Sequence, residues 1–283
     1  MAGVYFGYIG RSLGSELDWP RQDSNSYSNP KNRKLVGKSN PACTVRDSSG
    51  RLVQLSLKYS WPNGQTVDDN EVDSWELKAS RRALRNLKTL LAGQPMLDLL
   101  KNQIEEADAY FKDIIAKSNG QYRESRIDLQ AKGITLTQFM EWWKVWMGDL
   151  QAPDIKQKVF LDTMVPAHPE HYALPPYGSG IVETIGEHVA RVSIHPCANP
   201  PDFVKAYGDP TYLHLPATGT LEDGSILFYI LQEIRDSDEG CDFRLRLIFP
   251  AAAPQVFFDE HAEHLAVEFR SFINTALAWH QKH

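Results

Sequence analysis

The sequence has few cysteines and no long apolar run. Its three cysteines, Cys43, Cys197 and Cys241, lie far apart and form no CxxC pair. A disulfide framework or a zinc finger is therefore not expected. A reducing, cytoplasmic location is expected instead. No apolar run approaches the roughly 20 residues of a membrane-spanning helix. The first residues, MAGVYFGYIGRSL, lack the charged and long apolar regions of a signal peptide.

Positive charge and nucleotide-binding motifs are scarce as well. The formal net charge is −6, and no basic run is present. Because nucleic acids attract basic surfaces, a nucleic acid is not an expected partner. The lack of a long apolar run likewise makes a membrane an unexpected partner. The chain has no glycine-rich phosphate loop and no G-x-S-x-G motif. Nucleotide binding and serine hydrolysis are therefore not predicted.

The composition is that of a globular protein with a substantial core. Apolar residues make up 42% of the 283 residues and aromatic residues 11%. Residues 14–50 are polar and rich in turn formers, which predicts an extended surface arm. The stretch VQLSLKYSW alternates and predicts a half-buried strand. Leucines at helical spacing then predict two helices within residues 74–118, separated by GQP and expected to form an antiparallel helical hairpin.

The second half of the chain favours strands, followed by one long helix. GIVETIGEHVARVSI predicts one or two strands, and SILFYILQEI and CDFRLRLIF predict a hairpin around RDSDEG. An amphipathic stretch, EHAEHLAVEFRSFINTALAWHQKH, ends the chain. This order predicts an α+β fold in which a curled antiparallel sheet surrounds the C-terminal helix. We expect two domains, residues 1–130 with the arm and helical pair and residues 131–283 with the sheet.

A tryptophan-rich helix precedes the strands. In GITLTQFMEWWKVWM, Trp142, Trp143 and Trp146 follow helical spacing, and Thr135 with Gln138 predicts a capping box. Such a stripe serves as core or dimer contact, or as the wall of a pocket for an aromatic ligand. The sequence leaves both interpretations open.

The C-terminal helix carries polar residues on or beside its apolar stripe. His261 lies within the stripe, while His264 and Glu268 lie four residues apart on one face. A buried polar cluster costs stability unless its members are paired. The side chains of His264 and Glu268 can therefore share a proton or a metal ion, unless they form a solvated edge of the helix.

Four stretches, taken in order, resemble the 2,4-diacetylphloroglucinol hydrolase and phloretin hydrolase family. They are GITLTQFMEWWKVWM, HPEHY, VETIGE and HLAVEFRSFINTAL, and the resemblance covers residues 130–280. It implies a helix-grip (Bet v 1-like) catalytic domain and an N-terminal region used in homodimer formation. It also implies a zinc-dependent enzyme that cleaves the carbon–carbon bond between an acyl group and a phenolic ring.

By position, the resemblance implies metal ligands at Glu183, His264 and Glu268. The family's fourth ligand is a histidine at the end of the Trp-Trp helix, where this chain has Met147. A thioether is a poor ligand for a hard divalent ion. The nearest substitutes are the two histidines of HPEHY, His168 and His171.

A further family histidine, on the strand LFYILQEI, is replaced by Tyr229. These departures favour an enzyme without a metal, in which the carboxylates and His264 share a proton. The favoured function is a biosynthetic dehydration or ring closure, such as a Diels–Alder reaction, on a hydrophobic phenolic or polyketide-like substrate. The expected catalytic residues are Glu183, Tyr229, His264 and Glu268. The expected substrate contacts are Trp143, Trp146, His171, Tyr172 and His261.

Two alternatives remain from the sequence. The first is a zinc-dependent carbon–carbon hydrolase with Glu183, His171, His264 and Glu268 as ligands. The second is a module that binds an apolar ligand without catalysis. Metal content distinguishes the favoured function from the first alternative, and turnover of an aromatic ketone distinguishes both enzymes from the second.

Overall fold

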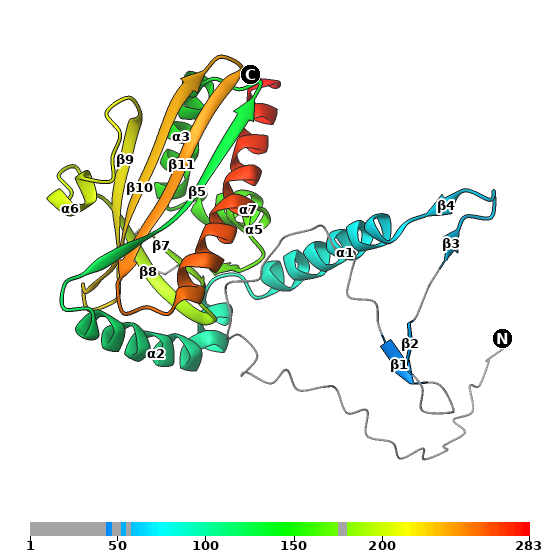
Figure 1. Cartoon of the computed structure of the whole chain (residues 1–283), viewed down its shortest axis with the longest axis horizontal. Helices are drawn as coiled ribbons and strands as arrows, with labels where there is room; N and C mark the ends of the chain where they lie inside the picture. The colour runs from blue at the N-terminus through cyan, green and yellow to red at the C-terminus, as the bar shows by residue number, and fades with distance from the viewer. Residues whose placement is uncertain (1–43, 47–51, 55–57, 175–179) are drawn as a thin grey trace. The chain divides into compact units, whose positions relative to one another are not determined.

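The structure is a computed structural model that describes residues 44–46, 52–54, 58–174 and 180–283. The chain divides into two compact units, residues 1–71 and residues 72–283. The helices and strands discussed below are labelled in Figure 1.

The first unit contains two short antiparallel strand pairs. Strand β1 (Thr44–Arg46) pairs with β2 (Leu52–Gln54), and β3 (Tyr59–Ser60) pairs with β4 (Thr66–Val67). Most of the arm expected at residues 14–50 lies outside the described residues, as does the middle of the strand expected in VQLSLKYSW. The described ends of that stretch belong to two separate strands, β2 and β3, and Trp61 at its end is half exposed rather than buried.

Two long helices follow, but they do not form the expected hairpin. Helix α1 (Asp69–Leu90) and helix α2 (Gln94–Lys117) run end to end rather than side by side (Figure 1). Gly93 separates them with a positive φ of 79°. The apolar face of α2 packs instead on the sheet, mainly on β8 (His188–Pro196). The short connection allows a hairpin, but α2 buries its apolar face against the sheet instead of against α1.

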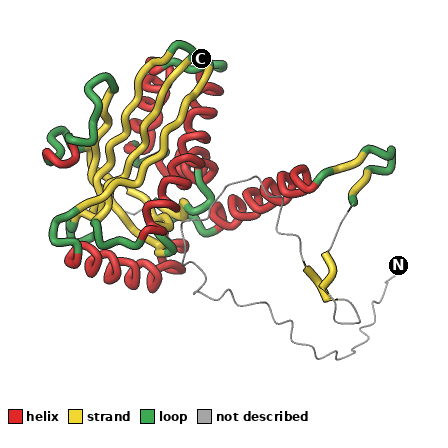
Figure 2. The backbone as a smooth tube through the Cα atoms, viewed as in Figure 1, coloured by secondary structure: helices red, strands yellow, loops and turns green. Residues whose placement is uncertain are grey.

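One antiparallel sheet of seven strands forms the centre of the second unit. Its strand order is β5-β11-β10-β9-β8-β7-β6. Figure 2 shows these strands as one curved layer with helices packed beside it. The hairpin predicted around RDSDEG is confirmed, because β10 and β11 pair from Tyr229–Ile248 to Ser237–Gly240. Besides β8, the strands are β5 (Tyr122–Lys132), β6 (His171–Ala173), β7 (Gly180–Ile185), β9 (Leu213–Thr220), β10 (Ile226–Ser237) and β11 (Gly240–Pro250).

The sheet curls around the last helix, α7 (Gln255–His280). This helix contacts β5 and β11 at one end of the strand order and β7 near the other end. A single straight helix can touch strands so far apart in the order only if the sheet wraps around it. The chain therefore has the α+β helix-grip architecture, which is Bet v 1-like, and the predicted fold class is confirmed.

Helical segments connect β5 to β6. Helix α3 (Leu136–Gln151) begins at the predicted capping box, in which the Thr135 side chain accepts from Gln138 N–H. The chain continues through α4 (Lys156–Val159), a π-helical turn (Phe160–Met164) and α5 (Val165–Ala167). A short helix, α6 (Asp202–Lys205), connects β8 to β9. Among the described residues, no helix is long and apolar enough to cross a membrane.

The expected domain boundary at residues 130/131 is wrong. It falls inside β5, which pairs with β11 along its whole length. The compact unit begins at Val72 and includes most of α1 and all of α2. Strand β5 joins the sheet by pairing with β11, which lies more than a hundred residues later in the chain. Local sequence patterns could not predict this long-range pairing.

The turn between β7 and β8 fastens the sheet to the start of α7. Gly186 and Glu187 both have positive φ, 52° and 68°, as a two-residue hairpin turn of this hand requires. A side chain at position 186 would overlap the ring of Phe257 in α7. Glycine is therefore needed here for close packing as well as for backbone conformation.

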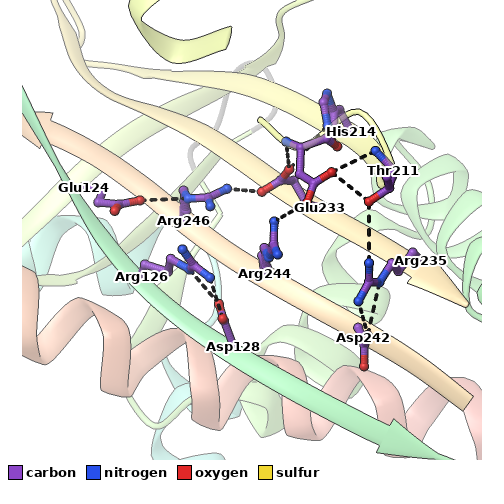
Figure 3. Close-up of polar contacts among 11 residues, drawn as sticks. Glu124, Arg126, Asp128, Thr211, His214, Glu233, Arg235, Asp242, Arg244 and Arg246 are labelled. Carbon is purple, nitrogen blue, oxygen red and sulfur yellow. Dashed lines mark hydrogen bonds and ion pairs between the residues drawn. The ribbon is translucent and has the colours of Figure 1, made fainter. Parts of the chain in front are cut away.

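The outer face of the sheet, opposite α7, carries a buried ion-pair network (Figure 3). Arg246 on β11 forms an ion pair with Glu233 on β10, and its Nε lies 2.8 Å from Oε2 of Glu124 on β5. Glu233 is 0% exposed and Arg246 is 2% exposed. The second oxygen of Glu233 accepts the Asp209 N–H at 2.7 Å. Each buried charge thus has partners from neighbouring segments, as burial requires.

Removing one member of this pair should destabilise the fold strongly. We expect Glu233→Ala to lower the free energy of unfolding by about 3–5 kcal/mol, since Arg246 would remain buried without its partner. The double variant Glu233→Leu with Arg246→Met should lose much less than Glu233→Ala alone. Urea denaturation followed by circular dichroism measures both changes. Arg235→Ala, which removes a half-exposed pair with Asp242, is the control and should cost at most about 1 kcal/mol.

Homodimer formation remains a prediction, with α1 and the start of α2 as the expected contact. Leu77, Leu87, Leu90 and Leu99 are each more than half exposed. Replacing Leu87 and Leu90 by glutamate should shift a dimer to a monomer, because the charges would be buried in the contact. Light scattering on a sizing column measures the mass, with Leu213→Glu on β9 as the control. A monomeric wild-type protein at micromolar concentration would contradict the prediction.

Candidate metal centre

Three elements of the helix-grip unit bring polar side chains together between the sheet and α7. His171 on β6 is the direct cross-strand neighbour of Glu183 on β7. His264 and Glu268 lie one turn apart on α7. Because β6 and β7 are neighbours and α7 packs across the inner face, all four side chains meet in one buried cluster.

Three donor atoms of the cluster form a closed triangle. His171 Nε2 lies 3.1 Å from His264 Nε2 and 3.4 Å from Glu183 Oε2. The third side, between His264 Nε2 and Glu183 Oε2, is 3.5 Å. Glu268 Oε1 lies 3.5 Å from His171 Nε2, which is one corner of this triangle. Two ring nitrogens and two carboxylates therefore point toward one small volume.

The orientation of His171 is set by a backbone carbonyl. Its Nδ1 lies 2.7 Å from the Met164 oxygen, which can only accept, so Nδ1 carries the proton. Nε2 then presents its lone pair to the cluster when the ring is neutral. Met164 is the last residue of the π-helical turn, an irregularity found frequently at functional sites. A histidine held in this way is typical of a metal ligand.

His168 joins the cluster in a different role. Its ring stacks on that of His264, with centroids 3.7 Å apart, and the His168, His171 and His264 ligand atoms lie within 4.8 Å of one another. The backbone N–H of Glu170 donates to His168 Nδ1 at 3.2 Å. In the neutral ring the proton is therefore on Nε2. That atom of His168 can donate a hydrogen bond, but it cannot bind a metal ion in this form. His171 is thus the better substitute for the missing fourth ligand.

Glu268 and His171 hold protons more tightly than usual. Burial raises the pKa of Glu268 to about 7, with a smaller lowering contribution from His171 and a raising one from Glu183. For His171, burial alone lowers the pKa, but the hydrogen bond to Glu183 and the charges of Glu268 and Glu183 outweigh it and raise the pKa overall. Without a cation, His171 and Glu268 therefore both favour their protonated forms, and a proton can be shared between them.

The three other histidines around the cluster, His168, His261 and His264, have lowered pKa values and favour the neutral form. Burial, followed by the charges of neighbouring histidines, lowers the pKa of His264 well below its usual value. Burial is also the main reason that the pKa of His261 is lowered to about 4 and that of His168 to about 3. His261 stacks on His264 with centroids 5.1 Å apart. A neutral imidazole is the form that binds a metal ion.

The triangle fits a tetrahedral zinc ion. With zinc–nitrogen and zinc–oxygen distances of about 2.0–2.1 Å, the edge of a regular tetrahedron is roughly 3.3 Å. The three measured sides, 3.1, 3.4 and 3.5 Å, lie close to this value. Two histidines and a carboxylate are also a common donor set of catalytic zinc sites, which leave a fourth position open. The residues present therefore suit the ion that the family resemblance implied.

The tryptophan helix packs against the same face of α7. The Trp146 ring lies 4.9 Å from that of Phe272, one turn beyond Glu268, and Trp143 stacks on Phe269 at 6.2 Å. Both tryptophans belong to the aromatic core or border it. The buried indole N–H of Trp146 has no hydrogen-bond partner among the described residues. An unpaired buried donor is rare and costs stability, so this N–H suits an acceptor on a bound molecule.

Two expected site residues lie elsewhere. Tyr172 points to the opposite face of β6 from His171, where its hydroxyl lies 2.9 Å from Thr184 Oγ1. Tyr229 lies on the outer face of β10, against Tyr122 and Phe203. Adjacent strand residues alternate between faces. Because both faces of β10 are apolar, the sequence carried no signal that could assign Tyr229 to the outer one.

The groups that orient the cluster leave little trace in the sequence. The Met164 carbonyl is invisible to side-chain motifs. Lys88, whose Nζ donates to the Pro169 carbonyl between the two histidines of HPEHY, lies on a helix far upstream. In RRALRNLK, the basic residues Arg81, Arg85 and Lys88 stand four and three residues apart, which places them on one helix face. This spacing was the only sequence signal for a contact by Lys88.

Comparisons with known proteins identify no family for this chain. No family model matches it, and no curated protein matches it. Among solved structures, the chain is similar to the crystal structure of Ara h 8.0201, with 10% identity and a TM-score of 0.35. The match covers 56% of this chain and 99% of that chain. At this level the likeness has no bearing on activity, ligand or partners.

Proposed function

We propose that this protein is a metal-dependent hydrolase with a zinc-type centre at His171, Glu183 and His264. The triangle of donor atoms with sides of 3.1, 3.4 and 3.5 Å is the observation that carries the proposal. The buried carboxylates and histidines need a cation or a shared proton. A divalent ion satisfies all three donors at once.

The chain's residues have separate roles in this proposal. A bound zinc ion would supply Lewis acidity that activates water and polarises a substrate carbonyl. His171 keeps its Nε2 lone pair directed inward because the Met164 carbonyl holds the Nδ1 proton. His264 and Glu183 complete the donor set from the helix and the neighbouring strand.

Glu268 is the proposed proton carrier. Its carboxylate lies 3.5 Å from His171, beside the donor triangle, and burial raises its pKa to about 7 when no cation is bound, so it is placed to accept a proton from water and pass it on. In hydrolysis of an acyl–ring bond, the acyl carbon gains the hydroxyl of water and the ring carbon gains a proton. Glu268 would deliver that proton, and His168, which stacks on His264, would donate a hydrogen bond to the substrate.

The proposed substrate is a small aromatic ketone. The resemblance of the Trp-Trp helix and the H-x-x-x-E helix to the acylphloroglucinol hydrolase family supports this class. Trp146 supports it independently, since its ring packs on Phe272, one turn of α7 beyond Glu268, and its N–H has no partner within the described residues. An aromatic ligand with a carbonyl or phenolic oxygen would offer both a ring and an acceptor.

A metal-free cyclisation is the second candidate. The raised pKa values of His171 and Glu268 favour it, because a shared proton also stabilises the cluster. In that case His171 and Glu268 would polarise a substrate carbonyl as proton donors. A non-catalytic module for an apolar ligand is compatible with the same fold, but it leaves the convergence of the acidic residues and histidines without a role.

Metal analysis tests the proposal directly. Protein purified without chelator should contain about one zinc ion per chain, and His171→Ala should lose most of it, since one of three donors is removed. Hydrolysis of 2,4-diacetylphloroglucinol or phloretin should stop on chelation and return with zinc. Elemental analysis and a chromatographic product assay measure the two properties.

The matched control is His195→Ala, which removes an exposed histidine from β8 and should leave both properties unchanged. Full turnover after chelation would overturn the metal-dependent proposal in favour of the cyclisation. Metal binding without turnover of any aromatic ketone would oppose the hydrolase.

The stability of the metal-free protein should depend on Glu268. Its folded pKa of about 7 lies above the usual 4.5, so its contribution to stability is full below pH 4.5 and is lost as the pH rises through 7. Glu268→Gln should therefore be the more stable protein above pH 7, by at most roughly 3 kcal/mol. Thermal unfolding between pH 5 and pH 8 (about 3 pH units) measures this. Identical pH profiles for the two proteins would contradict it, and zinc should flatten the wild-type profile.

A further inference from the structure

A basic pocket lies on the surface beside the segment that carries His168 and His171. Its volume is about 290 Å³. One wall is α1, which contributes Arg81, Arg82, Arg85 and Lys88, and the other wall contains Pro166 and Pro169. None of the residues lining this pocket is acidic. The proposed metal centre uses none of these four cations.

Two of the cations are anchored to the opposite wall. Arg81 Nη1 donates to the Pro166 carbonyl at 3.3 Å, and Lys88 Nζ donates to the Pro169 carbonyl. Lys88 is only 3% exposed and lies over the Tyr172 ring at 5.2 Å. These contacts hold α1 against the segment, so the positive groups are positioned before any ligand arrives.

The positive charge of the pocket is only partly balanced. Arg85 lies 3.2 Å from Asp162, but that carboxylate is also paired with Lys158. Arg82 has no ion-pair partner in the part of the chain that the structure describes. Burial lowers the pKa of Lys88 to about 8, and the charge of Glu170 only partly opposes this effect. A buried ammonium group in this state gains stability from a nearby anion.

We propose that this pocket binds a small oxyanion, the carboxylate or phosphate group of a ligand, between Arg82, Arg85 and Lys88. Guanidinium groups match the planar geometry of carboxylate and phosphate oxygens. Lys88, which also lines the pocket, adds a buried ammonium charge. The site is separate from the proposed metal centre, although both share the 165–171 segment, so the two proposals stand or fall independently.

Calorimetric titration of the full chain tests the site with two probes, inorganic phosphate and benzoate. We expect saturable binding of at least one probe, and the tighter one identifies the preferred group. Arg82→Ala should weaken it roughly tenfold through loss of a charged donor. Arg270→Ala removes an equal charge from an exposed position on α7 and should change affinity less than about twofold.

His171→Ala separates this pocket from the metal centre. Binding through the pocket should persist in that variant. The proposal is overturned if neither probe binds, or if Arg82→Ala and Arg270→Ala weaken binding equally. It is also overturned if His171→Ala abolishes binding while Arg82→Ala does not, because the probe would then occupy the metal centre.

Discussion

The packing of α7 into the curve of the sheet is the contact on which the rest of this structure depends. The helix joins strands from both ends of the sheet order, so the curl of the sheet and the position of the helix stabilise each other. Along one face of α7, Phe269 and Phe272 lie in the aromatic core, while His264 and Glu268 approach the sheet. The candidate metal centre is thus part of the main packing contact.

A polar cluster inside such a contact is stable only when its charges are matched. The two faces of the sheet match their buried charges differently. On the outer face, Glu233 and Arg246 neutralise each other in a buried pair. On the inner face, Glu183 and Glu268 meet His171, whose pKa they raise, and Glu183 also meets His264, whose pKa burial lowers. The inner cluster therefore lacks a full set of permanent positive charges, and this difference makes it a candidate for a cation or a functional proton.

Periodicity was sufficient for local structure and for the fold class. The capping box at Thr135, the β10–β11 hairpin and the amphipathic C-terminal helix follow from short-range spacing. Pairing between distant segments was not predictable in this way. The membership of β5 in the sheet, and the packing of α2 on β8 instead of α1, depend on competition among apolar surfaces that are remote in sequence.

By itself, the sequence determined that His264 and Glu268 share a helix face, because four residues make about one turn. It also determined that Glu183 lies on an alternating strand. Only the tertiary structure favoured His171 over His168 as the further member of the cluster, through the β6–β7 register and the Met164 carbonyl. It likewise decided that Tyr229 faces away. The physical reason is that local spacing fixes the relative direction of neighbouring side chains, whereas the choice of inner or outer face depends on what the whole sheet encloses.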